Sequence, residues 1–133
     1  MPIEVEMLFR ILLAMVLGGI VGYEREHSGK AAGLRTNTLI CVGSCLITLV
    51  SIYGFSETDI SRIAAGIVTG VGFLGAGAIL RQSEGHVEGL TTAATIWAVA
   101  GIGLAVGAGM YFLSAVGTGV ILLILLIDRV KFR

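Results

Sequence analysis

The chain has 133 residues, of which 56% are apolar and only 14% charged, with 20 glycines and a formal net charge of zero. A soluble domain averages about 25% charged residues and about 7% glycine, so this chain would lack the polar surface that keeps a soluble protein dissolved. The composition, with a mean hydropathy of +0.96, predicts an integral membrane protein, and the balanced charge argues against a nucleic-acid partner.

Apolar runs of membrane-spanning length follow one another along the chain. A spanning helix needs about 20 apolar residues. Five runs approach that length: residues 7–23, 36–54, 62–80, 92–108 and 110–127. Only residues 107–109 separate the last two runs, so one long kinked helix is the alternative there. The sequence therefore predicts an all-α membrane bundle of about five transmembrane helices, forming a single domain over residues 1–133.

The basic residues predict how this bundle is oriented. Five spans place the termini on opposite sides, and cytoplasmic loops carry an excess of Lys and Arg. All Lys and Arg residues except Arg10 and Arg62 lie after the first and third runs or in the C-terminal tail. We therefore expect an outside N-terminus and a cytoplasmic C-terminus, with Arg10 extending its charge toward water. The acidic first residues are the reverse of a cleavable signal.

A polar segment occurs twice in the chain. Segments 23–36 and 79–92 share five residues at a constant offset of 56 positions. The matching pairs are Arg25/Arg81, Gly29/Gly85, Gly33/Gly89, Leu34/Leu90 and Thr36/Thr92. Each copy is a charged turn between two apolar runs, so the repeating unit is a helical hairpin. Two parallel hairpins would bring both turns together on one face of the protein.

Glycine is concentrated in the third run. Five of its glycines would occupy two opposite helix faces: Gly66, Gly70 and Gly77 on one, Gly72 and Gly75 on the other. Membrane helices associate where small residues allow close approach. We therefore predict that the third helix lies at the centre of the bundle. Gly101 belongs to a further ridge of small residues in the fourth run. Small-residue surfaces that are not used within the bundle are expected to pair two subunits as a homodimer.

The repeated turns place charged and hydroxyl groups at the membrane boundary. Glu24, Arg25 and Glu26 must lie at the interface or be paired, because an ionised group at the bilayer centre costs about 2.5–3.5 kcal/mol. The natural ion pairs join Glu24 or Glu26 to Arg25, Arg35 or Arg81. Thr36 and Thr92 are suited to cap the helices that follow the two turns, since a threonine hydroxyl can accept from free first-turn amides.

Three interpretations of this polar region stay open. Its residues can serve only as caps and ion pairs, as a binding surface for the membrane part of another protein, or as an ion or small-anion site beside helix N-termini. A Mg²⁺ site is the weakest version, because almost any acidic loop supplies the one or two carboxylates that Mg²⁺ requires. Its ligands would be Glu24, Glu26, Glu84 and Glu88. We therefore expect no resident metal and no cofactor.

Motifs for enzymatic chemistry are absent from the sequence. It contains no nucleophile–base pair, HExxH, phosphate loop or CxxC. Cys41 and Cys45 share one face of an apolar run and are expected to be buried small residues. We therefore predict that the protein is not an enzyme.

Five blocks of the chain carry a family resemblance: 24–26, 32–36, 62–65, 72–79 and 89–97. In their order and spacing they resemble the MgtC/SapB family of bacterial inner-membrane proteins, over nearly the whole chain. The resemblance implies a multi-helix domain of the bacterial inner membrane with a cytoplasmic C-terminal side. It also places the family's shared polar positions, which with Glu26 form the candidate functional cluster: Glu24, Arg25, Arg35, Thr36, Asn37, Arg81, Thr91 and Thr92.

The resemblance also implies a function. Pathogen members are virulence factors associated with growth in low Mg²⁺, linked to inhibition of the F-type ATP synthase through its membrane sector rather than to Mg²⁺ transport. Those members carry an additional cytoplasmic C-terminal domain that this sequence does not contain, so the membrane core rather than the virulence role is expected to carry over. We expect an inner-membrane regulator that contacts another membrane complex, plausibly ATP synthase, under Mg²⁺ limitation or acid stress. The alternative is an oligomeric ion or small-solute transporter, which the duplicated hairpin suits.

Overall fold

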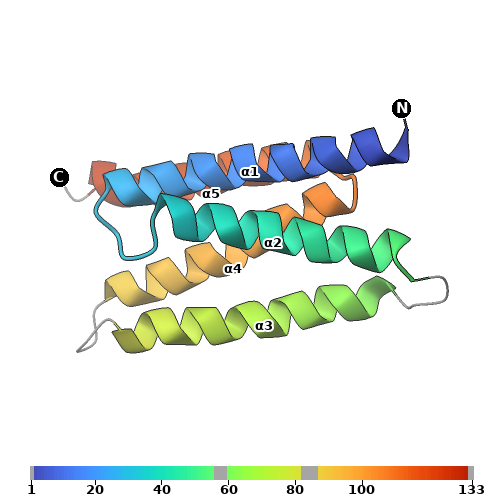
Figure 1. Ribbon diagram of the computed structural model, residues 1–133. Coiled ribbons are helices and arrows are strands. Elements are labelled where there is room, and N and C mark those ends of the chain that lie inside the picture. The colour runs from blue at the N-terminus through green and yellow to red at the C-terminus, as the bar shows by residue number, and fades with distance from the viewer. Residues whose placement is uncertain (1, 56–59, 82–86, 132–133) are drawn as a thin grey trace.

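The chain runs back and forth as five helices along one axis. The computed structural model describes residues 2–55, 60–81 and 87–131. Its helices are α1 (Ile3–His27), α2 (Leu34–Tyr53), α3 (Ile60–Arg81), α4 (Val87–Gly107) and α5 (Tyr111–Lys131). Figure 1 shows that α1 and α3 end, and α2 and α4 begin, at the same end of the bundle, which we call the loop end. α1 begins at the opposite end. The predicted parallel arrangement of two hairpins is confirmed.

Four of the five predicted membrane spans are confirmed by length and composition. In the part of the chain that the structure describes, α1 to α4 are long and apolar enough to cross a bilayer, and α5 adds a shorter apolar segment, Tyr111–Ile127. α4 and α5 are separate helices, so the alternative of one long kinked helix is wrong. The chain reverses at Gly109, whose φ of +82° is a left-handed conformation that glycine adopts without a Cβ clash.

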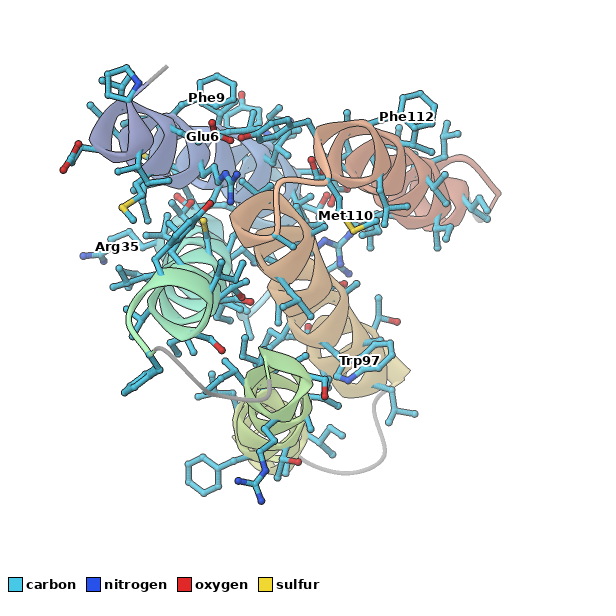
Figure 2. All side chains as sticks on the ribbon, turned by 90° about the vertical axis from the view of Figure 1, so that its right-hand side faces the viewer. Glu6, Phe9, Arg35, Trp97, Met110 and Phe112 are labelled. Atoms are coloured by element: carbon cyan, nitrogen blue, oxygen red, sulfur yellow. The ribbon has the colours of Figure 1, made fainter. Side chains whose placement is uncertain are left out.

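α4, not α3, is the central helix. It packs on each of the other helices, whereas α3 packs on α4 and, less extensively, on α2. Figure 2 looks along the bundle and shows α4 between the other helices, with α3 at the edge. The prediction of a central α3 is therefore wrong, because glycine spacing marks a smooth surface without saying which helix lies against it.

The glycines of α3 are mostly open. Only one of the five faces a neighbour closely: a Cβ added to Gly75 would lie 3.5 Å from the Cβ of Ala93. A Cβ would meet no described atom within 4 Å at the other predicted packing glycines: Gly66, Gly70, Gly72, Gly77 and Gly101. Pairing of two subunits through these surfaces stays a prediction.

The closest helix contact among the described glycines joins α2 to α4, where a Cβ on Gly103 would overlap the carbonyl oxygen of Cys41. A Cβ on Gly103 would lie 2.9 Å from the Cβ of Ser44, and a Cβ on Gly107 would lie 2.7 Å from the Cβ of Thr48. The Ser44 hydroxyl donates a 2.7 Å hydrogen bond to the carbonyl of Ala100, 56 residues away. That separation is the offset of the repeat, so equivalent positions of the two hairpins meet here. An approximate two-fold axis between parallel α2 and α4 produces such self-matching contacts.

Arg10 fastens the end of the bundle opposite the loop end, and the expectation that it extends toward water is wrong. It is buried. Its guanidinium donates to the carbonyl of Gly107 at 2.8 Å, to the hydroxyl of Tyr111 at 3.0 Å and to the carboxylate of Glu6 at 2.5 Å. The Gly107 carbonyl belongs to the last turn of α4, where a cation is favoured. Arg10 thus joins α1 to the end of α4 and the start of α5.

Candidate functional site

A buried ion pair closes the loop end of α1. Arg25 Nε donates to the Glu24 carboxylate at 2.7 Å, and the Ser28 hydroxyl donates to the other oxygen of that carboxylate at 3.0 Å. Both charged residues are buried. Arg25 Nη1 has no hydrogen-bond partner among the described residues. Burying a charged donor without a partner is unfavourable, so this nitrogen remains a position for a further acceptor.

Glu26 takes the capping role that the sequence assigned to threonine. α2 begins after Gly33 without a side-chain cap from its own first turn, and the carboxylate of Glu26 accepts from the backbone N–H of Leu34 at 2.9 Å. A carboxylate at a helix N-terminus is favoured by the helix dipole. The prediction that Thr36 caps α2 is wrong, because α2 starts two residues before it.

The second predicted cap is also wrong. α4 begins at Val87, so Thr92 lies inside the helix rather than before it. Thr92 is 1% exposed, and its hydroxyl has no partner among the described residues. The apolar run predicts a helix only from residue 92, because the residues at the start of α4 include Glu88 and two threonines.

Asn37 ties the first loop to α2. It is completely buried, and its side-chain amide donates to the carbonyls of Ala32 and Gly33 at 3.0 and 2.9 Å. Its Oδ1 has no partner in the described part of the chain. Asn37 therefore holds the end of the loop and leaves one acceptor unused.

A hollow between the two hairpins brings equivalent residues together. This loop-end hollow has a volume of about 500 Å³. Its lining includes Thr36 of the first hairpin and Thr92 of the second, which are matched positions of the repeat. Ala32 of the first loop belongs to one buried cluster with Ile96 of α4. The two hairpins therefore share one hollow at the loop end. The meeting of the two turns stays a prediction, because residues 82–86 lie outside the described part of the chain.

The remaining residues of the predicted cluster are more exposed or lie outside the description. Arg35 and Thr91 are exposed. Arg81 ends α3 at the loop end, but its side chain lies outside the described residues, as do Glu84 and the side chain of Glu88. The predicted ion pairs of Arg81 and the four-carboxylate Mg²⁺ site are therefore untested.

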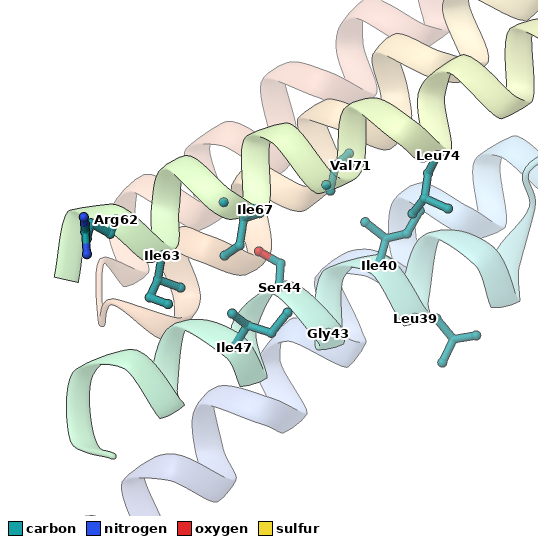
Figure 3. Close-up of a pocket in the computed structure, with 12 residues that line it drawn as sticks. Leu39, Ile40, Gly43, Ser44, Ile47, Arg62, Ile63, Ile67, Val71 and Leu74 are labelled. Atoms are coloured by element: carbon teal, nitrogen blue, oxygen red, sulfur yellow. The ribbon is translucent and has the colours of Figure 1, made fainter. Parts of the chain in front are cut away.

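A second hollow, which we call the α2–α3 furrow, runs between those helices with a volume of about 490 Å³ (Figure 3). It is lined by Leu39, Ile40, Gly43, Ser44, Ile47, Arg62, Ile63, Gly66, Ile67, Gly70, Val71 and Leu74. Arg62 supplies its charge, and the Ser44 hydroxyl is bonded to α4. The furrow is therefore apolar along most of its length. It shares Leu39, Ile40 and Leu74 with the loop-end hollow, so the two adjoin.

The furrow is the uncovered counterpart of a face that α5 covers. α5 packs against α4 and α1, and its Leu125 lies in one buried cluster with Ile102 and Val106 of α4. Residues 56 positions earlier lie on α2 beside the furrow and are open: Leu46 is 52% exposed against 4% for Ile102, and Val50 is 48% exposed against 0% for Val106. α5 therefore covers one face of the four-helix repeat, and the equivalent face stays open. The two halves also differ in packing, because α1 packs more extensively on α4 than α3 does on α2.

The same asymmetry appears on the outer helices. Leu17 of α1 is buried, whereas its counterpart Phe73 on α3 is 80% exposed. On the inner helices, Thr95 is buried and its counterpart Leu39 is exposed. Sequence reasoning missed this furrow. The signal that could have found it is that the 56-residue repeat accounts for four runs and leaves the fifth without an equivalent.

Comparisons with known proteins show the family of this chain. The model of the MgtC family matches residues 11–131. The chain is 48% identical to YhiD of Escherichia coli K12, whose name describes it as a candidate magnesium transporter, over 96% of this chain and 63% of YhiD. It is 45% identical to SapB of Bacillus subtilis, over 82% of this chain and 50% of SapB. It is also 45% identical to MgtC of Brucella abortus, over 79% of this chain and 44% of that protein.

The chain therefore spans between 44% and 63% of the length of these three relatives. No solved structure matches it.

Proposed function

This chain belongs to the MgtC family of multi-pass membrane proteins, and on that premise we propose that it is a regulator in bacterial magnesium homeostasis that binds another integral membrane protein within the bilayer. The magnesium link is supported by the name of its relative YhiD. The distribution of basic residues supports an inner-membrane orientation with the N-terminus outside and the loop end in the cytoplasm.

The observation that carries this proposal is the uncovered α2–α3 furrow. On the opposite side of the approximate two-fold axis, a transmembrane helix, α5, covers the equivalent face. The furrow side presents an apolar face that no described helix covers, and Leu46 and Val50 are exposed beside it. A helix from a second protein would complete the symmetric arrangement.

Close packing, rather than removal from water, would supply the affinity. Apolar side chains gain little by leaving lipid, so membrane helices associate where small residues let backbones approach. Gly43, Gly66 and Gly70 line the furrow, and a Cβ added at any of them would meet no described atom within 4 Å. A partner ridge can therefore approach both α2 and α3. The family resemblance makes the membrane sector of the F-type ATP synthase the first partner to test.

A transporter is the second candidate, favoured by the unused polar atoms at the loop end. Arg25 Nη1, Asn37 Oδ1 and Thr92 Oγ1 are all buried without partners among the described residues. Internal hairpin repeats are common in transporters, whose substrate sites lie between the repeats. In this interpretation the polar atoms would line the path of an ion or small solute.

Filling the furrow tests the proposed regulator. Gly70→Leu places a side chain in open space within the furrow, so the fold is retained while the partner helix is blocked. Gly119→Leu on α5 is the matched control, because a Cβ there also meets no described atom within 4 Å. We expect ATP synthase membrane-sector subunits to co-purify from native membranes with the wild type and Gly119→Leu and to be lost with Gly70→Leu.

Equal recovery from both variants would contradict this docking site. A separate flux assay in proteoliposomes decides the transporter alternative. Ion movement by the wild-type chain that is abolished by Arg25→Ala, without any co-purifying subunit, would replace the regulator by the transporter.

A further inference from the structure

The α2–α3 furrow has a single charged group at one end. Arg62 lies on the first turn of α3, at the end of the furrow opposite the loop end, as Figure 3 shows. It is exposed. Within the described residues it takes part in no hydrogen bond or ion pair. Among the described residues, the furrow therefore presents a guanidinium without a partner beside an apolar channel.

On the face that α5 covers, the residues equivalent to Arg62 and Gly66 bind the first turn of α5. Arg62 and Gly66 stand 56 residues after Glu6 and Arg10. Glu6 and Arg10 hold the start of α5, because the Tyr111 hydroxyl donates to Glu6 at 3.0 Å and accepts from Arg10 at 3.0 Å. In the furrow a cation replaces the carboxylate, and open space at Gly66 replaces the arginine side chain.

The reversal of charge predicts a different first turn on the helix that binds there. Resting on the proposed docking function, we infer that the furrow binds a partner transmembrane helix carrying a carboxylate in its terminal turn, level with Arg62. A planar guanidinium recognises a carboxylate through paired hydrogen bonds. The missing side chain at Gly66 gives that carboxylate room to reach Arg62.

The ion pair would set the depth of the partner helix. An apolar helix can slide along an apolar furrow with little change in packing, whereas a single charged contact fixes one register, as polar positions do in coiled coils. Unpaired charged groups within a membrane are unfavourable, so the pair also rejects helices that lack the acid.

A peptide with the α5 sequence is a suitable probe, because α5 fits the equivalent face. The probe is residues 111–131 labelled at the C-terminal end, carrying either Tyr111→Glu or the uncharged control Tyr111→Gln. The full chain, labelled at Ile20→Cys on α1, is reconstituted in phosphatidylcholine vesicles. The native thiols of Cys41 and Cys45 are buried and do not compete for the label. Binding is measured at pH 7 by energy transfer.

We expect the Glu peptide to bind about tenfold more tightly than the Gln peptide, the size of a well-placed pair of opposite charges. Arg62→Gln should abolish this preference. Arg35→Gln, which removes another exposed arginine at the loop end, should leave it intact. Preference retained in Arg62→Gln would overturn the inference.

The outcomes separate this inference from the proposed function. Equal, saturable binding of both peptides would overturn the selection by Arg62 and leave furrow docking standing. Failure of both peptides to bind would overturn both. Self-association that requires Glu4 of a second copy, without peptide binding, would show the furrow to be an interface between copies and would also overturn the assignment.

Discussion

At the residue scale, the buried Arg10 connects three helices of this structure. It links the start of α1, the last turn of α4 and the first turn of α5 through three hydrogen bonds. Its guanidinium also lies 5.9 Å from the ring centroids of both Tyr53 and Tyr111, within the range of a cation–π contact. A charge in this apolar setting is tolerated because the guanidinium has three hydrogen-bond acceptors and lies near two tyrosine rings.

We predict that Arg10→Met lowers the stability of the protein by about 2–3 kcal/mol, because the Gly107 carbonyl and the Glu6 carboxylate lose their charged donor. The melting temperature of the purified protein in detergent, followed by circular dichroism, measures this. Arg35→Met removes an exposed arginine and serves as the control. Equal melting temperatures for the two variants would show that the Arg10 contacts contribute little.

Residue identity alone predicted some of these roles and not others. Glu24 and Arg25 were predicted to be paired because charges at a membrane boundary need partners, and the pair is present. The roles predicted for Thr36 and Thr92 are wrong because α2 and α4 begin before these residues. The role predicted for Arg10 is wrong because its partners, Gly107 and Tyr111, are brought close only by tertiary packing. Thr92 becomes internal once α4 begins earlier, and Arg10 becomes buried once α5 folds back over it.

At the scale of helices, glycine serves two different purposes in this protein. Gly103 and Gly107 allow α4 to approach α2, whereas the glycines of α3 leave open surface. Helical spacing predicts packing contacts at the α3 glycines, because these glycines form two long stripes along the helix. Spacing describes one helix, but contact depends on the partner, so the close α2–α4 contact could not be read from it.

We therefore predict opposite effects for two alanine substitutions on α4. Gly103→Ala should destabilise the protein by about 1–3 kcal/mol, because its Cβ would overlap Cys41 and Ser44. Gly101→Ala enters open space and should leave stability unchanged or slightly raise it. Melting temperatures of the two proteins, purified side by side, test this. Comparable losses would mean that α2 and α4 are not in close contact.

At the scale of the whole molecule, the duplicated hairpin explains most of the architecture. The 56-residue offset predicted parallel hairpins that bend at one end, and apolar run lengths predicted the spans. Neither predicted where α5 lies, because α5 has no equivalent in the repeat and its position depends on contacts with α1 and α4. Since α5 covers only one of two equivalent faces, the other face stays open as the α2–α3 furrow, the candidate docking site.

The most direct test of the central claim places a photo-reactive benzoylphenylalanine at Leu46, beside the furrow, in cells that make the full chain. Leu12 on α1, which is also exposed on the outside of the bundle, is the matched control position. The docking account predicts that irradiation joins Leu46, and not Leu12, to one membrane-sector subunit of the ATP synthase. Cross-links from Leu46 to lipid alone, or the same products from both positions, would contradict it.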